Sequence, residues 1–381
     1  MNRLSSRRDG FALAVALAAI VIIGGLIAGV FYASTQEYRI GRNTILQTRA
    51  LAGAEDGLNA VLVRNGAGWQ TAWNNASPGF VVTKVYHPSD STNDTVRVMS
   101  LGSGSFLVTS EGRAGRVAGA QGHRRVGALV TLWAPTINMR GALTTRGATK
   151  IGGSSFIDGN DTATVNNWNC PPGGAAMPGI AAADPTQITT SGCNSLNCIA
   201  GNPKIQKDSA AADTSTYTVF GDLKWADLVA MANKYPPSST MNGMKASFTS
   251  GGCNIADQYN WGDPYRTGSD TSCASYYPII YASSDLQLTG GYGQGILLVE
   301  GNLQVSGGFE FFGPVIVRGT LKTTGTGGHF NGGVMAENVD LEQNTVLGDA
   351  VVRFSSCTVN RALLGTASPT LVKGRSWTEL F

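Results

Sequence analysis

The N-terminal part of the sequence contains 23 consecutive uncharged residues, from Phe11 to Ala33, and nearly all of them are apolar. A helix of this length would measure about 34 Å, enough to cross a hydrocarbon core of about 30 Å. A cleaved secretory signal has a shorter apolar region of about 7–15 residues. A buried core helix rarely runs so far without a charge. We therefore predict a single membrane-spanning helix.

Charge is distributed unevenly along the chain. Residues 1–64 contain seven arginines and four acidic residues, whereas the remainder is electrically balanced. Arg3, Arg7 and Arg8 precede the apolar run, so we expect that end to stay in the cytoplasm. The bulk of the chain would then be periplasmic or extracellular. No basic surface remains for a nucleic acid, and no such partner is expected.

The helical pattern continues beyond the apolar run. Apolar residues recur at roughly helical spacing as far as Leu62, charged residues lie between them, and no proline interrupts residues 11–64. Asn65-Gly66 is a plausible stop signal. We predict one helix over residues 11–64, about 80 Å long, with one half in lipid and the other half amphipathic.

Two segments carry a resemblance to a known family. The basic residues, Gly10-Phe11 and the unbroken apolar helix resemble a type IV prepilin leader, which the family's peptidase cuts after the glycine. Residues 49–58 (RALAGAEDGL) resemble the A-x-x-A-E-x-G-L segment of PilX-type minor pilins. More weakly, residues 106–115 and 126–132 resemble the strand pair of that family's headpiece. Major pilins carry Glu at the fifth mature position, where this chain has Val15.

This resemblance implies a structural minor pilin or pseudopilin that assembles, primes or decorates a type IV pilus or related filament. Residues 1–10 would be the leader, cut between Gly10 and Phe11. The implied partners are the inner membrane, other pilins or pseudopilins and the prepilin peptidase. Two alternatives share the same anchor: an adhesin or glycan-binding module at the cell surface, and a polysaccharide-acting enzyme.

Short β-branched segments follow the helix. Residues 80–87, 95–101, 105–110 and 125–134 alternate partly and are separated by Gly, Ser and Asp turns, as strands are. A long helix on such a short antiparallel sheet is an α+β arrangement. We predict a small β headpiece over residues 65–134.

Beyond the headpiece, an irregular repeat predicts an all-β region. Segments 295–303, 313–321 and 333–341 share glycine-flanked apolar runs, with offsets of 18 residues from Val299 to Val317 and 19 from Val317 to Ala336. This length suits the rung of a parallel β-helix, in which short strands stack on themselves with Gly or Asn at the corners. A sandwich is the alternative, although hairpin turn pairs are missing. We assign residues 135–160 and 285–365 to the β-helix.

Residues 161–284 are expected to form a disulfide-rich insert with one helix, from Asp222 to Tyr235, and residues 366–381 a C-terminal tail. An even number of cysteines in an exported chain favours disulfides. No Cys-x-x-Cys pair and no nearby His supports zinc, and several connectivities remain open. The disulfide candidates are Cys170, Cys193, Cys198, Cys253, Cys273 and Cys357.

No nucleophile, zinc-protease or phosphate-loop motif is present, so we expect no enzyme activity, metal or cofactor. Paired carboxylates could cleave glycosidic bonds, but only analogy with other β-helices suggests it. The pairs are Asp158 with Asp161, Asp263 with Asp270, and Glu300 with Glu310. An aromatic run containing Trp261 and Tyr265 either stacks on sugars or forms a small core in the insert.

Overall fold

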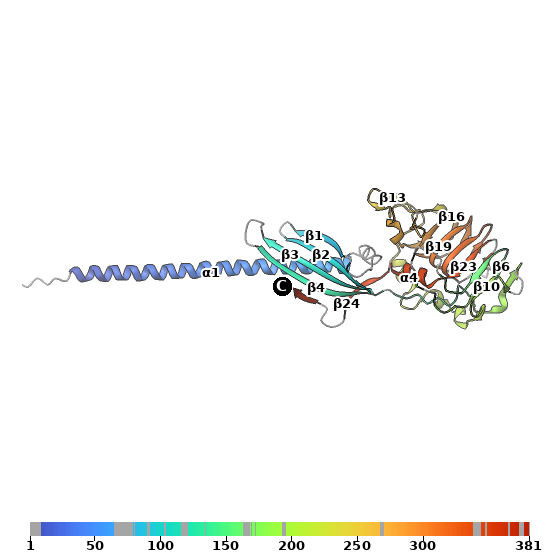
Figure 1. The fold of residues 1–381 in the computed structure, drawn as a ribbon, viewed down its shortest axis with the longest axis horizontal. Coiled ribbons are helices and arrows are strands. Elements are labelled where there is room, and N and C mark those ends of the chain that lie inside the picture. The colour runs from blue at the N-terminus through green and yellow to red at the C-terminus, as the bar shows by residue number, and fades with distance from the viewer. Residues whose placement is uncertain are drawn as a thin grey trace, which may run out of the picture.

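The computed structural model describes residues 9–64, 79, 81–89, 92–102, 104–115, 121–133, 135–162, 168, 170–171, 173–192, 196–266, 270–337, 344–346, 349–364, 366–372 and 377–380. A long N-terminal helix leads into a small antiparallel sheet, and a parallel β-helix lies beyond the sheet (Figure 1). The predicted fold class, with an α+β anchor and headpiece and an all-β outer region, is confirmed.

Helix α1 (Asp9–Arg64) is unbroken over 56 residues. Every side chain from residue 11 to residue 33 is exposed, and this stretch is apolar and long enough to cross a membrane. From about Leu46 onward, the helix packs on the headpiece. One helix therefore has an unpartnered apolar half and a packed half.

The headpiece is an antiparallel sheet that covers the second half of α1. Its strands are β1 (Val81–Ser89), β2 (Thr92–Gly102), β3 (Ser105–Gly115), β4 (Gln121–Trp133), β24 (Ser368–Leu371) and β25 (Trp377–Leu380). The helix contributes Ala54, Leu58 and Val61 to a core shared with alternate residues of β2, β3 and β4. The predicted tail therefore holds strands β24 and β25, and both pair with β4.

Two glycines let the helix approach the sheet closely. A Cβ on Gly112 would lie 2.1 Å from the carbonyl oxygen of Ala50, and one on Gly122 would lie 2.2 Å from that of Leu46. No larger residue fits at either position without moving backbone atoms.

The β-helix has three parallel ladders, which we call the covered face, the open face and the third face. Strands β16, β19 and β21 bend round a corner and each serve two ladders. The covered face contains β15 (Ile279–Ala282), β17 (Ile296–Val299), the ends of β19 (Phe309–Val317) and β21 (Gly328–Ala336), β5 (Leu143–Thr145), β8 (Ile180–Ala182) and β11 (Ile205–Lys207).

The open face contains β12 (Thr240–Met244), the start of β16 (Leu286–Gln294), β18 (Leu303–Ser306), β20 (Leu321–Thr323), β22 (Asn344–Val346), β6 (Thr149–Gly152) and β9 (Ile188–Ser191). The third face contains the end of β16, the starts of β19 and β21, β23 (Val351–Phe354), β7 (Phe156–Asp158) and β10 (Ile199–Ala200). A separate small hairpin joins β13 (Phe248–Thr249) and β14 (Gly252–Cys253).

The chain enters this stack in the middle. It runs outward through β5 to β11, and residues 208–239, which we call the strap, then return along the covered face to the opposite end. From there it runs back through β12 to β23. The first and last rungs therefore pair with each other: Leu143 with Val334, Thr149 with Asn344, and Phe156 with Val351. We call this junction the seam.

Residues 161–284 do not form a separate insert as the sequence predicted. Residues 161–284 supply β8 to β12 and β15 as well as the strap, so the β-helix extends further than the sequence indicated. The predicted helix from Asp222 to Tyr235 is shorter, as α3 (Trp225–Ala230). A further helix, α4 (Ser356–Leu364), was not predicted; it follows β23 and leads back to the headpiece.

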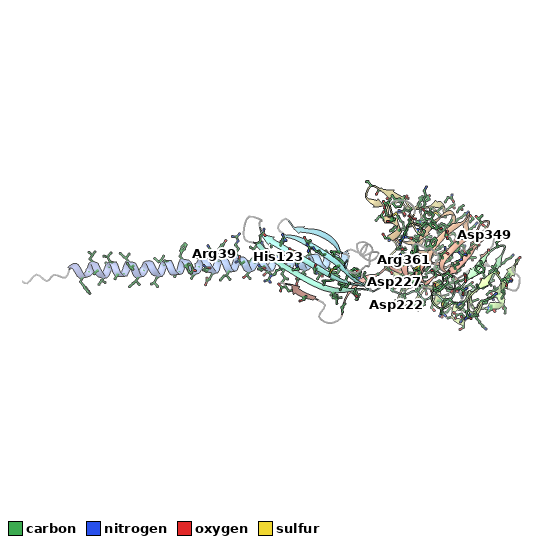
Figure 2. All side chains as sticks on the ribbon, viewed as in Figure 1. Arg39, His123, Asp222, Asp227, Asp349 and Arg361 are labelled. Atoms are coloured by element: carbon green, nitrogen blue, oxygen red, sulfur yellow. A yellow bond between two sulfur atoms is a disulfide. The ribbon has the colours of Figure 1, made fainter. Side chains whose placement is uncertain are left out.

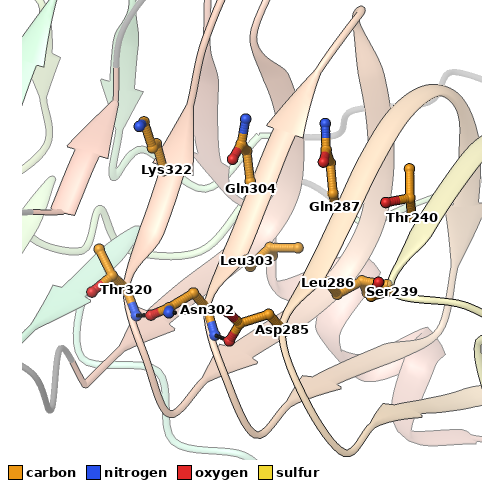
Figure 3. A pocket seen from close by; sticks show the side chains of 10 residues that line it. All are labelled: Ser239, Thr240, Asp285, Leu286, Gln287, Asn302, Leu303, Gln304, Thr320 and Lys322. Carbon is orange, nitrogen blue, oxygen red and sulfur yellow. Dashed lines mark hydrogen bonds between the residues drawn. The ribbon is translucent and has the colours of Figure 1, made fainter.

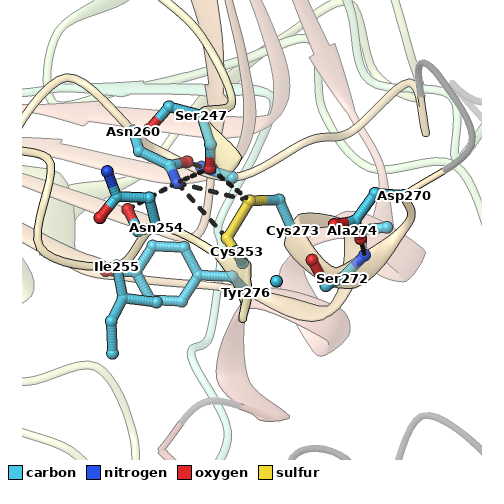
Figure 4. The surroundings of a disulfide bond; sticks show 12 residues. Ser247, Cys253, Asn254, Ile255, Asn260, Asp270, Ser272, Cys273, Ala274 and Tyr276 are labelled. Carbon is cyan, nitrogen blue, oxygen red and sulfur yellow. Dashed lines mark hydrogen bonds between the residues drawn. A yellow bond between two sulfur atoms is a disulfide. The ribbon is translucent and has the colours of Figure 1, made fainter. Parts of the chain in front are cut away.

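Disulfides hold the outer region. Cys170 is bonded to Cys357, 187 residues away, and Cys253 is bonded to Cys273. Cys198 is also disulfide-bonded, whereas Cys193 lies outside the described residues. Beside the second bond, the side-chain amide of Asn260 donates to two backbone carbonyls and lies 3.4 Å from both sulfur atoms (Figure 4).

Replacing both Cys170 and Cys357 with Ser should lower the free energy of unfolding by about 2–5 kcal/mol, because this bond closes a long loop across the seam. The matched variant, Cys253→Ser with Cys273→Ser, opens a separation of 20 residues. On the same chain-entropy argument its loss should be about 2 kcal/mol smaller. Denaturant unfolding of the full chain in detergent measures both losses of unfolding free energy. Equal losses would contradict the expectation that the bond across the seam stabilises the fold more than the Cys253–Cys273 bond does.

Gly122→Ala should destabilise the packing of α1 on the headpiece by about 1–3 kcal/mol, because the added Cβ meets the backbone of Leu46. Gly41→Ala is the matched control: nothing lies within 4 Å of a Cβ there, and Ala is the better helix former. Hydrogen exchange of the α1 amides reports the difference. Unchanged protection in Gly122→Ala would show that the close approach is not required.

Candidate functional site

The first candidate surface is the apolar half of α1. Gly10 and Phe11 lie in its first turns, and Phe11 is 78% exposed. Val15 is also exposed, on a helix that offers no carboxylate between residues 11 and 36. Beyond the apolar run the helix becomes polar, and Arg39 marks this exposed neck between the apolar part and the headpiece (Figure 2).

The residues of the pilin-like segment lie where α1 approaches the sheet. Ala50 and Ala54 are fully buried, and Leu58 is nearly so. Glu55 points to solvent. The small residues of this segment therefore have a packing role: they let α1 pass over Gly112 of β3.

A charged cluster lies on the outer face of the headpiece. The carboxylate of Glu111 contacts Arg113 at 2.7 Å, His123 at 2.6 Å and Arg125 at 3.1 Å. The hydrogen bond from Arg113, against the opposing effect of burial, lowers the pKa of Glu111 to about 2. His123 lies on the headpiece in Figure 2. These contacts connect β3 and β4 and leave the carboxylate fully engaged.

The second candidate surface is the open face. Its strands alternate, with Leu286, Leu303 and Leu321 inside and polar residues outside. Register places the outer residues one above another in a row, which we call the polar row (Figure 3). Its members are Thr240, Gln287, Gln304, Lys322, Thr345, Lys150 and Thr189. The side chain of Thr345 lies outside the described part of the structure.

One corner of the open face is fixed by its own hydrogen bonds. The backbone N–H of Asn302 donates to Asp285 at 2.8 Å, and that of Thr320 donates to the side chain of Asn302 at 2.8 Å. Between this corner and the polar row lies a groove of about 560 Å³. A second pocket of about 240 Å³, lined by Tyr235 and Tyr281, adjoins it through shared residues.

The covered face presents a different chemistry. An alternating ladder of charges crosses its rungs: Glu300 contacts Arg318 at 2.5 Å, and Arg318 and Arg146 flank Glu337 at 3.9 and 3.4 Å. The Glu337 side chain is only 3% exposed, and this burial raises its pKa. Because Glu337 and Arg146 belong to opposite sides of the seam, the ladder supports the junction.

The two aromatic residues for which the sequence left sugar contact and a small core open, Trp261 and Tyr265, do not form a common surface. Trp261 is fully buried: its indole packs edge-on against Phe309 and donates to the carbonyl of Gln258. Of the two alternatives, sugar contact is therefore wrong for Trp261 and the core alternative is confirmed, since neither ring face is free. Tyr265 is partly exposed, and its hydroxyl donates to Glu310; burial raises its pKa.

The candidate carboxylates are engaged in structure. Asp161 accepts from Ser356 and Gly174, and these bonds lower its pKa although burial opposes them. Asp263 is fully buried, and Glu300 belongs to the charge ladder. Over the residues that the structure describes, no three His, Cys, Asp or Glu side chains gather as metal ligands would.

No protein-family model and no curated protein matches this sequence. Among solved structures, the chain aligns with the crystal structure of the competence-associated pilin ComZ from Thermus thermophilus, with 12% identity and a TM-score of 0.22. The alignment covers 88% of this chain and 96% of that chain. A TM-score this low does not establish a shared fold, so the proposals below rest on the residues of this chain.

Proposed function

We propose that this protein is a structural, pilin-like subunit of a type IV pilus or a related filament. The observation that carries the proposal is the division of α1: an exposed apolar half long enough to cross a membrane, and a second half packed on an antiparallel headpiece. Such a helix can be stored in the inner membrane and transferred to the core of a filament, because both surroundings are apolar.

The finer role we propose is that of a minor subunit of the PilX type, acting in assembly, priming or decoration. Support comes from residues 49–58, whose small side chains pack on the sheet. The β-helix is attached at the end of the headpiece away from the apolar half (Figure 1), so it would project from the membrane or filament. Its partners would be other pilins and the prepilin peptidase.

The role is structural rather than catalytic in this proposal. The carboxylates that a polysaccharide-cleaving enzyme would need are held by Arg, Ser and Tyr partners, as Glu300, Asp161 and Glu310 are. The adhesin alternative is favoured by one specific observation, the polar row of the open face, which is developed in the next subsection.

Gly10→Glu should block leader removal, because the family's peptidase cuts after this glycine. The native chain would then keep its first ten residues, which a mass measurement detects. Gly29→Ala is the control, since nothing lies within 4 Å of a Cβ at that exposed helix position. Processing of Gly10→Glu, or a native wild-type chain that keeps Met1, would contradict the proposal.

Val15→Glu should be tolerated and should raise incorporation along the filament shaft. Cleavage leaves a positive amine on Phe11, and a buried unpaired ammonium costs several kcal/mol; a carboxylate at position 15 would pair with it. Leu17→Glu is the matched control, with the same charge in the wrong place. The ratio of this subunit to the major pilin in sheared filaments is the measurement, and equal ratios in both variants would refute the pairing argument.

A further inference from the structure

We propose that the open face of the β-helix binds an acidic polysaccharide, which lies along the stack over the polar row. This goes beyond the proposed structural role, because it assigns a ligand site to the projecting part of the chain. The row comprises hydroxyl, amide and ammonium groups on successive strands, led by Gln287, Gln304 and Lys322 (Figure 3).

The geometry favours a linear polymer. Register places the row on seven neighbouring strands, and at about 4.8 Å per strand it extends about 29 Å. Hydrogen-bonding groups recurring at a fixed interval along a line match a chain of repeating units. A small ligand would use only two or three of them.

The side chains have the chemistry that sugar hydroxyls require. A glutamine amide both donates and accepts, so it can pair with a hydroxyl in either sense. In the described part of the chain, the amides of Gln287 and Gln304 and the ammonium of Lys322 make no hydrogen bond to protein. These groups are held in position by their strands and are directed to solvent.

The charge of the row specifies the class of polysaccharide. It contains Lys322 and Lys150 and no carboxylate. The one acid that lines the groove among the described residues, Asp285, accepts from the backbone of Asn302 at the corner. Two cations along the row suit a polymer that carries carboxylates on its sugars. A nucleic acid, with a phosphate at every step, would require a more strongly basic surface.

An aromatic side chain lies at one end of the groove. Tyr235 is 52% exposed, and its ring meets Tyr281 edge-on at 6.5 Å. Its hydroxyl donates to the carbonyl of Ala232 at 2.9 Å, which holds the ring in place. An exposed ring beside a polar groove offers an apolar face on which a sugar can stack.

The other two faces cannot serve in the same way. The strap covers the outside of the covered face, whose central strands are buried on both sides: Leu297 and Leu298 of β17 are both fully buried. On the third face, Phe312 is buried beneath Trp168 and Tyr265. The partly exposed row of the third face includes Glu310 and Phe156. Over the described residues, the open face is the one of the three whose outward row combines amide and ammonium groups without a carboxylate.

The test measures binding of the full chain in detergent micelles to three probes: polyuronate oligomers, neutral dextran and single-stranded oligothymidylate. Polyuronate should bind, and more weakly as salt rises. Gln304→Ala with Lys322→Ala should weaken it about tenfold or more, since two hydrogen-bonding groups are lost. The matched control, Gln206→Ala with Lys207→Ala, removes the same residue types from exposed positions on β11 and should bind as the wild type does.

Circular dichroism should show both variants folded. The proposal is overturned if polyuronate does not bind, if both variants weaken equally, or if oligothymidylate binds more tightly than polyuronate. Dextran binding as tight as polyuronate, with no salt dependence, would overturn the acidic specificity. The measurement uses purified subunit, so its outcome is independent of whether the chain enters a filament.

Discussion

Pairing across the seam is the interaction on which the outer region depends. Because the chain enters the β-helix in its middle, β5, β6 and β7 have to find β21, β22 and β23 at the far end of the sequence. The Cys170–Cys357 bond, the contact of Arg146 with Glu337 and the hydrogen bonds of Asp161 with Ser356 all join the same two sides. Both connections to the headpiece leave from this region, which is how β24 and β25 can return to β4.

The three faces of the β-helix explain why some segments of the sequence are apolar throughout and others alternate between apolar and polar residues. Runs such as Ile296–Val299 are apolar throughout because the strap buries their outer side, as expected for parallel strands covered on both faces. Strands of the open face alternate because one side meets water. Whether a segment of the repeat is apolar throughout or alternates is therefore set by the ladder to which it belongs.

Local patterns predicted α1, the headpiece strands and the later rungs, since hydrophobic period and glycine corners are properties of neighbouring residues. They did not predict that β24 and β25 complete the headpiece, or that β8 to β12 belong to the stack. Strands as short as Ile199–Ala200 carry no period, and the pairing of Leu143 with Val334 depends on residues far apart in the chain.

Local sequence patterns also did not identify the candidate functional surface. The sequence left Trp261 and Tyr265 open between sugar contact and a small core, and the structure places Trp261 in the core. A signal for the polar row was present: Gln287, Gln304 and Lys322 recur at 17 and 18 residues, each between two buried positions. Comparing the polar residues at the outward positions of successive rungs predicts the polar row.

The central claim is that α1 anchors the chain first in a membrane and then in a filament, with the β-helix outside. The most direct measurement is mass spectrometry of this chain in surface filaments sheared from cells of its native source. The account predicts an N-terminal peptide that begins at Phe11 in the filament fraction. A chain found only in the membrane fraction, with Met1–Gly10 attached, would contradict it.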